Sequence, residues 1–165
     1  MEETNKKIIN LDLSATKGTT IQVDGNPDAS FVLNLSDLSI YNRLEEGLKR
    51  LYELFIQLKN QMGEAAEKEV PETAEDGSEE DISQFTSIMK DVDDKMRGIV
   101  DYIFSAPVSS ACAPNGCMFD VFEGQLRFEY IINALTKLYE NNINKEFYNL
   151  KSRINSKLPS YVKKG

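Results

Sequence analysis

Hydrophobic and polar residues alternate in the first part of the chain. The alternation occurs in three short runs, at residues 9–13, 21–23 and 31–35. Successive side chains of a β-strand point to opposite faces, so each run places its apolar residues on one face. Turn-forming residues separate the runs, namely Lys17-Gly18 and Asp24-Gly25-Asn26-Pro27. The pattern predicts a three-stranded antiparallel β-meander within residues 1–36, which must lie on an apolar layer supplied by the rest of the chain.

Helical spacing replaces the alternation in residues 37–63. Apolar residues recur there every three or four positions, which is the spacing of one helix face. They are Tyr41, Leu44, Leu48, Leu51, Phe55, Leu58 and Met62. A second stripe of the same kind consists of Phe85, Met89, Val92, Met96, Ile99 and Ile103. The two stripes favour an intramolecular antiparallel hairpin of two helices, and homodimerisation through the stripes is the second arrangement that fits them.

An acidic segment, residues 64–81, separates the two stripes. It holds nine acidic residues and one basic residue, so it carries the whole net charge of −8. Val70-Pro71 interrupts any helix there. The segment contains almost no apolar side chain whose burial would offset the entropy of ordering it. We therefore expect a disordered linker that says nothing about the charge of the folded part.

The region at residues 82–144 holds the second helix and predicts a third. The second helix ends near Phe104, because Pro107 disfavours helical backbone just before it. Residues 105–124 are rich in proline and glycine, and they predict a connection with a short hairpin. The third helix follows from about residue 125 to residue 141.

The C-terminal residues, 145–165, predict a fourth helix and a basic tail. Asn141-Asn142 is expected to break the preceding helix, since asparagine favours turns over helix interiors. Six basic residues stand in this part against one acidic residue, Glu146. Together the elements predict an α+β fold that is mainly α, in which the N-terminal meander packs on a bundle of three to four helices beside a disordered acidic loop.

The sequence offers little material for catalysis or metal binding. It contains no histidine, the commonest acid–base residue near neutral pH. Cys112 and Cys117 form a single C-x4-C pair, which supplies too few ligands for a zinc site, and a disulfide between them is disfavoured in a reducing cytosol. The remaining candidates are the isolated carboxylates Asp101, Asp120, Glu123 and Glu129. We expect a protein that is not an enzyme, with no catalytic residue, no metal site and no cofactor.

Composition also argues against two kinds of partner. The apolar runs are only a few residues long, which is too short to span a membrane, and no secretory signal is apparent, so we expect a cytoplasmic protein. The chain has 19 basic and 27 acidic residues, which is not the balance of a nucleic-acid-binding protein. Neither a membrane nor a nucleic acid is therefore the expected partner.

The apolar stripes and the aromatic residues are the candidate contacts for a protein partner. The stripes are wider than the seam of a helical hairpin requires, which leaves part of each one for another helix. Methionine side chains adapt to irregular partners, and aromatic side chains are common anchors of interfaces. The predicted partner-binding residues are Tyr41, Leu48, Phe55, Met62, Met89, Met96, Tyr130 and Tyr148.

Three segments of the chain, taken in order, resemble a known protein family. They are LNLSDLSIYNRLEEGLKRLYEL (residues 33–54), DDKMRGIVDYIFSAPVSSACAPNGCMFD (residues 93–120) and LRFEYIINALTKLYE (residues 126–140). With the strand–turn–strand opening and the charged linker, they resemble the small tail assembly chaperones of siphophages and prophages of Gram-positive bacteria. The resemblance covers most of the chain up to about Asn144, and it rests on patterns of residue class.

Two short motifs of that family can be compared position by position. Residues 35–41 stand where the family has an F-x-D-x-x-Y type of sequence. A later element, hydrophobic–Asp–x–hydrophobic–Phe–Gly, is matched by Val100, Asp101, Ile103 and Phe104, but Ser105 occupies the position of the glycine.

The resemblance implies a non-catalytic function in phage assembly. Such chaperones bind apolar helical segments of the tape measure protein in the bacterial host cytoplasm before the tail tube polymerises, and they are absent from the finished tail. The implied partner is thus the tape measure protein or another tail protein. Two alternatives remain: a structural head–tail or tail component retained in the virion, and a small regulatory module that binds another protein.

Overall fold

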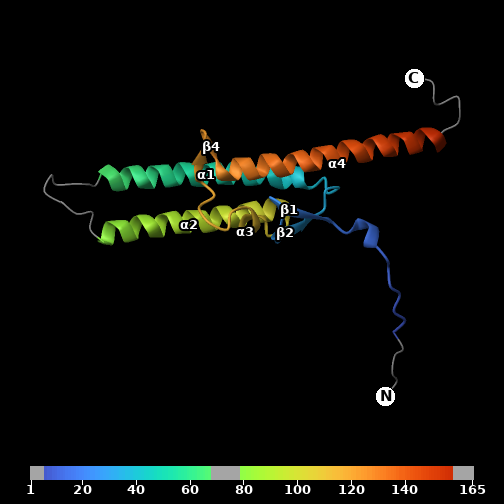
Figure 1. Cartoon of the computed structure of the whole chain (residues 1–165), viewed down its shortest axis with the longest axis horizontal. Coiled ribbons are helices and arrows are strands. Elements are labelled where there is room, and N and C mark those ends of the chain that lie inside the picture. The colour runs from blue at the N-terminus through green and yellow to red at the C-terminus, as the bar shows by residue number, and fades with distance from the viewer. Residues whose placement is uncertain (1–5, 68–78, 158–165) are drawn as a thin grey trace, which may run out of the picture.

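The structure is a computed structural model that describes residues 6–67 and 79–157. It is mainly helical with a small antiparallel hairpin at its N-terminal side, and this confirms the predicted fold class. Figure 1 shows α1 and α2 side by side, with α4 lying along them and extending beyond them at one end. The elements are β1 (Thr19–Val23), β2 (Asn26–Leu33), α1 (Ile40–Glu67), α2 (Glu79–Phe104), α3 (Val108–Cys112), β3 (Val121–Phe122), β4 (Gln125–Leu126) and α4 (Arg127–Lys157).

The N-terminal sheet consists of β1 and β2, which pair antiparallel with Ile21 opposite Phe31. Asp24 and Gly25 connect the strands with φ values of 51° and 71°. Positive φ at both positions is the two-residue turn that an Asp-Gly sequence favours in hairpins. The register places Phe31 and Leu33 on the inner face, where both are buried in the core.

The third strand predicted at residues 9–13 is wrong. Residues 6–13 have no regular secondary structure, and Figure 1 shows them leading away from the body of the protein. A single 3-10 turn, Ser14–Thr16, separates them from β1 and is closed by a hydrogen bond from the Thr16 N–H to the Leu13 carbonyl at 2.9 Å. Because this turn directs the run away from β1, the run pairs with no strand in the described part of its own chain.

The antiparallel hairpin favoured by the sequence is formed by α1 and α2. Its buried side chains include Ile40, Leu51, Leu58, Val92, Met96, Val100 and Ile103. Both helices extend further than the sequence predicted, because α1 continues to Glu67 and α2 begins at Glu79. The flanks of the predicted acidic linker are therefore helical, while its middle, residues 68–78, and the tail at residues 158–165 lie outside the described residues.

The connection between α2 and α4 contains the short hairpin that the sequence predicted. Its strands β3 and β4 pair antiparallel, with Val121 opposite Leu126. Glu123 and Gly124 form the turn, again with positive φ values, of 50° and 79°. The short helix α3 precedes this hairpin and packs near β2.

The break predicted at Asn141-Asn142 is wrong, because α4 continues without interruption to Lys157. Asparagine in a helix interior costs only about 0.7 kcal/mol relative to alanine, which neighbouring contacts can offset. One such contact is a hydrogen bond from Asn142 Nδ2 to Ser36 Oγ at 3.2 Å. The third and fourth predicted helices are thus one helix, whose first half is anchored by Phe128, Ile132, Leu135 and Tyr139.

Candidate protein-interaction site

The densest cluster of charged groups ties the α2–α4 connection to α2. The carboxylate of Asp93 is buried and accepts hydrogen bonds from the Met118 N–H and from Arg97 Nε, each at 2.7 Å. Arg97 also donates to the carbonyls of Ser109 at 3.3 Å and Gly116 at 2.8 Å. Charge-assisted hydrogen bonds of this kind are stronger than neutral ones. The cluster therefore fixes the path of the connection.

Two of the carboxylates considered for catalysis have similar structural roles. Asp101 accepts hydrogen bonds from the N–H and the hydroxyl of Ser109, at 2.7 and 3.0 Å, which holds the start of α3. Asp120 accepts from the Cys117 N–H at 2.9 Å and forms an ion pair with Arg127 at 3.2 Å. Arg127 is the first residue of α4, so this pair orients the helix as it leaves the connection.

The other two carboxylates lie at the same end of α4. Glu129 accepts hydrogen bonds from the Leu126 N–H and from the Tyr52 hydroxyl, each at 2.9 Å, and so links α4 to α1. Desolvation, assisted by this contact with Glu129, raises the pKa of Tyr52 above its ordinary value. Glu123 occupies the turn between β3 and β4. Asp101, Asp120 and Glu129 thus support the local structure through their carboxylates.

The two cysteines are free thiols in this structure. Burial raises the pKa of Cys112 to about 11, and the carboxylates of Asp24 and Asp101 act in the same direction. Burial also raises the pKa of Cys117. Both thiols therefore stay protonated at neutral pH, whereas nucleophiles and metal ligands need the thiolate. Within residues 6–67 and 79–157, no three His, Cys, Asp or Glu side chains are grouped to hold a metal ion.

The distal segment of α4, residues 144–157, projects beyond the body of the protein, and every residue in it is exposed. Its sequence nevertheless keeps the spacing of a helix that packs on a partner. Apolar residues recur at intervals of four, three and four, which places them on one side of the helix. The series begins at the half-buried Ile143, just before the segment, and its exposed members, here named the distal stripe, are Phe147, Leu150 and Ile154.

Phe147 and Leu150 of the distal stripe, together with Ile143 just before them, form one wall of a groove of about 460 Å³. The opposite wall is the corner between β2 and α1, where Leu38 supplies an exposed apolar side chain. Ser36 and Asn142, joined by their hydrogen bond, lie at the inner end of this distal groove. An open apolar groove along a helix is a suitable seat for a second amphipathic helix.

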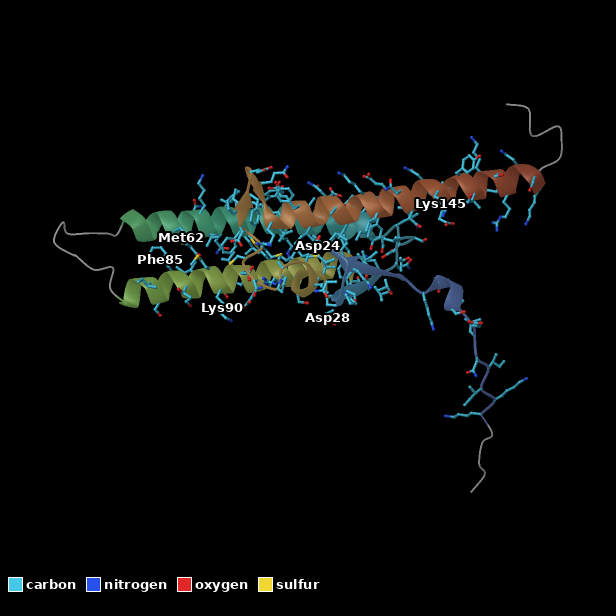
Figure 2. The ribbon with its side chains drawn as sticks, viewed as in Figure 1. Asp24, Asp28, Met62, Phe85, Lys90 and Lys145 are labelled. Atoms are coloured by element: carbon cyan, nitrogen blue, oxygen red, sulfur yellow. The ribbon has the colours of Figure 1, made fainter. Side chains whose placement is uncertain are left out.

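Basic residues surround the distal stripe. The segment carries four basic residues and one acidic residue, Glu146, so its net charge is positive. Figure 2 shows one of the basic residues, Lys145, on the part of α4 that projects from the body. Arg153 and the acidic Glu146 both line the distal groove. The surface therefore combines an apolar strip with a border whose net charge is positive.

A second groove, of about 610 Å³, lies between β1 and the first half of α4. Ile21 and Val23 line it from β1, and Tyr130, Ile131 and Leu138 line it from α4. A hydrogen bond from the Tyr130 hydroxyl to the carbonyl of Phe122, at 2.8 Å, fixes the ring at the rim. We name this cavity the hairpin groove, because the β1–β2 hairpin forms its outer wall.

The eight predicted contact residues fall into two groups. Five of them pack between α1 and α2 or against the core, and Figure 2 shows one of these, Met62, beside Phe85 between the two helices. They are Leu48, Phe55, Met62, Met89 and Met96, of which Met96 is fully buried. The three exposed ones are Tyr41, Tyr130 and Tyr148. Tyr148 is 75% exposed, about 100° further round α4 than Phe147.

Four exposed apolar residues are missing from the predicted set: Leu38, Phe147 and Leu150 line the distal groove, and Ile154 continues the distal stripe beyond it. The sequence does predict a fourth helix that carries Phe147, Leu150 and Ile154, but none of the three was among the predicted contacts. Two features of the sequence could have identified them. The apolar stripes of α1 and α2 cover each other, so no further apolar helix remains among the described residues to cover this face, and basic residues flank it.

Two further findings bear on the kind of partner. In the described part of the chain, no helix has both the length and the apolar character needed to cross a membrane. Comparison of the chain with protein family models, with curated proteins and with solved structures gives no match in any of the three.

Proposed function

We propose that the protein is a non-catalytic chaperone of phage or prophage tail assembly, which holds apolar helical segments of the tape measure protein before the tail tube polymerises. The observation that carries the proposal is the distal stripe, because Phe147, Leu150 and Ile154 are exposed on a helix that is otherwise patterned for packing. The sequence resemblance described above supplies the identity of the client.

The distal segment has a physical reason to bind another helix. A free helix of only about 14 residues is marginally stable in water, because nucleation is costly and each residue adds little. Burial of a Phe, Leu or Ile side chain contributes about 1.5–3 kcal/mol. A client helix that lies in the distal groove and continues along the distal stripe would cover Phe147, Leu150 and Ile154 and some of its own apolar side chains. One contact would then bind the client and stabilise the segment.

The positive border of the distal groove selects among apolar helices. Arg153 and Lys157 lie beside the stripe on one side and Lys151 on the other, judged from 3.6 residues per turn. A client helix with acidic residues next to its apolar face is therefore favoured. Attraction between exposed charges is screened by salt, so the affinity should fall as ionic strength rises.

Co-expression of the full-length protein with the tape measure protein encoded beside it tests the proposal. We expect a soluble complex that co-purifies, and a larger soluble fraction of the tape measure protein than without the chaperone. The double variant Phe147→Ser/Ile154→Ser should weaken binding about tenfold or more, because two apolar contacts are lost. Both side chains are exposed, so circular dichroism and the unfolding midpoint of the body should remain as in the wild type.

The matched control is Tyr148→Ser, which removes a more exposed aromatic side chain from another side of the same helix. We expect this variant to bind as the wild type does, and the comparison also tests whether Tyr148 is a contact as the sequence predicted. The proposal fails if the wild type does not bind the tape measure protein, or if the double variant binds equally well. Mass spectrometry of purified virions is a further test, since a protein retained there is a structural component and not a chaperone.

A further inference from the structure

A second unpartnered apolar surface lies at the other end of the chain. Residues 8–13 are extended away from the body and have apolar side chains at almost every odd position. Ile8 is 82% exposed and Leu11 is 79% exposed, and Ile9 and Leu13 are exposed as well. Single exposed apolar residues are common, but four within six residues mark a surface that is covered in another state of the protein.

The body of the protein offers a free strand edge beside an apolar groove. In the described residues β2 is the sole strand paired with β1, so the other edge of β1 keeps its backbone hydrogen-bonding groups for a further strand. The hairpin groove runs along β1, between this strand and α4, and is lined by apolar side chains of both. A groove between a strand edge and a helix accepts an extended segment as an added strand, with backbone hydrogen bonds for affinity and side-chain pockets for specificity.

The alternation along the segment agrees with the alternation along β1. Ile21 and Val23 are half-buried, line the groove and pack against the core, whereas Gln22, which also borders the groove, is exposed. Directly opposed residues of neighbouring strands project to the same face of a sheet. In the antiparallel orientation, a register that pairs Leu11 with Ile21 also pairs Ile9 with Val23, and it turns all the odd-numbered apolar residues of the segment into the groove.

Charge decides the direction of the added strand. In the antiparallel orientation this register brings Lys7 next to the end of β1, where Asp24 lies at the rim of the groove. Figure 2 shows Asp24 on the side of the hairpin toward α4. In the parallel orientation Lys7 would instead approach Lys17 at the start of β1. Opposite charges on neighbouring strands stabilise a pairing and like charges destabilise it, so the antiparallel orientation is favoured.

The turn before β1 decides which molecule supplies the strand. The Ser14 N–H donates to the Asp12 carboxylate at 3.0 Å, and the Thr16 N–H and hydroxyl both donate to the Leu13 carbonyl, at 2.9 and 2.7 Å. These bonds hold the segment pointing away from its own β1, and they would break if the segment folded back. The same bonds leave it extended toward solvent, where another molecule can take it up.

We propose that residues 8–13 of one copy of the chain add as an antiparallel strand to β1 of a second copy and fill its hairpin groove. Exchange of identical segments makes a closed two-fold dimer, in which each protomer gives and receives one strand. The site is separate from the distal groove. Dimerisation and client binding can therefore succeed or fail independently.

Cysteine cross-linking between two differently tagged proteins tests the register. Both proteins carry Cys112→Ala and Cys117→Ala; one adds Asn10→Cys and the other Gln22→Cys, two polar positions that the register places opposite each other. After mixing and mild oxidation we expect a covalent heterodimer on a non-reducing gel. Ser30→Cys in place of Gln22→Cys is the control, because Ser30 lies opposite Gln22 on β2, one strand further from the added segment, and it should cross-link at least severalfold less.

The result that overturns the proposal is the absence of the heterodimer. A monomeric cross-link in a chain that carries both Asn10→Cys and Gln22→Cys, without covalent dimer, would show that the segment folds onto its own β1, which also overturns it. Equal cross-linking with Ser30→Cys would reject the register.

Sedimentation of single variants measures the apolar contribution. Leu11→Ser should raise the dissociation constant of the dimer about tenfold or more, because Leu11 leaves the groove in both halves of the dimer. Ile8→Ser changes an equally exposed side chain that the register turns to the outer face, and should leave the dissociation constant unchanged within about twofold. Neither side chain packs on its own protomer, so folding is preserved. A monomeric wild type, or equal effects of the two substitutions, contradicts the proposal.

Discussion

The two halves of α4 have the same pattern and opposite surroundings. In the first half, Phe128, Ile132, Leu135 and Tyr139 recur every three or four residues and are all buried. In the distal segment, Phe147, Leu150 and Ile154 recur in the same way and are exposed. Helical spacing of apolar residues therefore indicates that a face needs cover, but it does not indicate whether the cover comes from the same chain.

The two halves of α4 differ in how many other elements pack against them. Around the first half, the ring of Tyr52 on α1 contacts the ring of Phe128 edge to face, with the ring centroids 5.5 Å apart. The ring centroids of Phe104, at the end of α2, and Tyr139 are 6.2 Å apart. The last side chain of α4 that packs against the core is Ile143, next to the hydrogen bond from Asn142 to Ser36. Beyond that point α1 and α2 have ended, and Figure 1 shows α4 continuing alone.

The largest expected effect separates these halves by stability. Phe128→Ala should lower the free energy of unfolding by about 3–5 kcal/mol, because a fully buried aromatic side chain is replaced by a cavity. Phe147→Ala, the same substitution in the distal segment, should change it by less than about 0.5 kcal/mol. Urea unfolding followed by circular dichroism measures both. Similar losses for the two variants would mean that the distal segment is covered in solution and that the contrast between the halves is absent.

The sequence predicted those parts of the fold that depend on local pattern. The stripes of α1 and α2 and the Asp24-Gly25 turn were visible because side-chain periodicity and turn chemistry are properties of neighbouring residues. The errors lie where tertiary contacts decide. Asn141-Asn142 has the composition of a break, but one hydrogen bond to Ser36 and the continuing apolar face keep the helix intact. The run at residues 9–13 has the alternation of a strand, but no strand among the described residues of its own chain pairs with it.

The candidate site was predicted less well than the fold, for the same reason. Met62 and Met96 belong to an apolar stripe as clearly as Phe147 and Ile154 do, and only the structure shows that the first pair is covered by a second helix. Exposure is a property of the whole assembly of elements. Residue type alone favoured the methionines, since methionine is common at adaptable surfaces.

A smaller effect contrasts the tightly packed body with an open helix face. Gly47 on α1 lies so close to α2 that an added Cβ would overlap the side chain of Ile103, whereas an added Cβ at Gly98 on α2 meets no neighbouring atom. Gly47→Ala should therefore destabilise the protein by about 1–3 kcal/mol through overpacking. Gly98→Ala should stabilise it by about 0.5–1 kcal/mol, because alanine is the better helix former. Thermal unfolding of the two variants should give midpoint shifts of opposite sign, and shifts of the same sign would contradict the close packing of α1 on α2.

The smallest effect concerns the corner at which α4 leaves the body. Asp37 accepts hydrogen bonds from Ser39 and, at 2.8 Å, from Arg43, which in turn donates to the Ile103 carbonyl at 2.9 Å. The hydrogen bond from the Ser39 hydroxyl, followed by that from Arg43, lowers the pKa of Asp37 below its ordinary value of 3.8. Asp37→Asn should lower the free energy of unfolding at pH 7 by about 0.5–1 kcal/mol, the usual scale of a partly exposed ion pair.

The sign of the pH dependence follows from the direction of that shift. A carboxylate whose pKa is lower in the folded state stabilises the protein above its ordinary value, and this contribution is lost as the pH falls through the lowered value. The difference between wild type and Asp37→Asn should therefore persist from pH 7 to about pH 5 and shrink below pH 4. Asp12→Asn is the control, since the hydrogen bond from the Ser14 N–H lowers the pKa of Asp12 too, but Asp12 lies outside the body. The free energy of unfolding of the body should not respond to Asp12→Asn at any pH. If the difference in free energy of unfolding between wild type and Asp37→Asn stayed the same from pH 7 to below pH 4, the charge of Asp37 would not hold the corner.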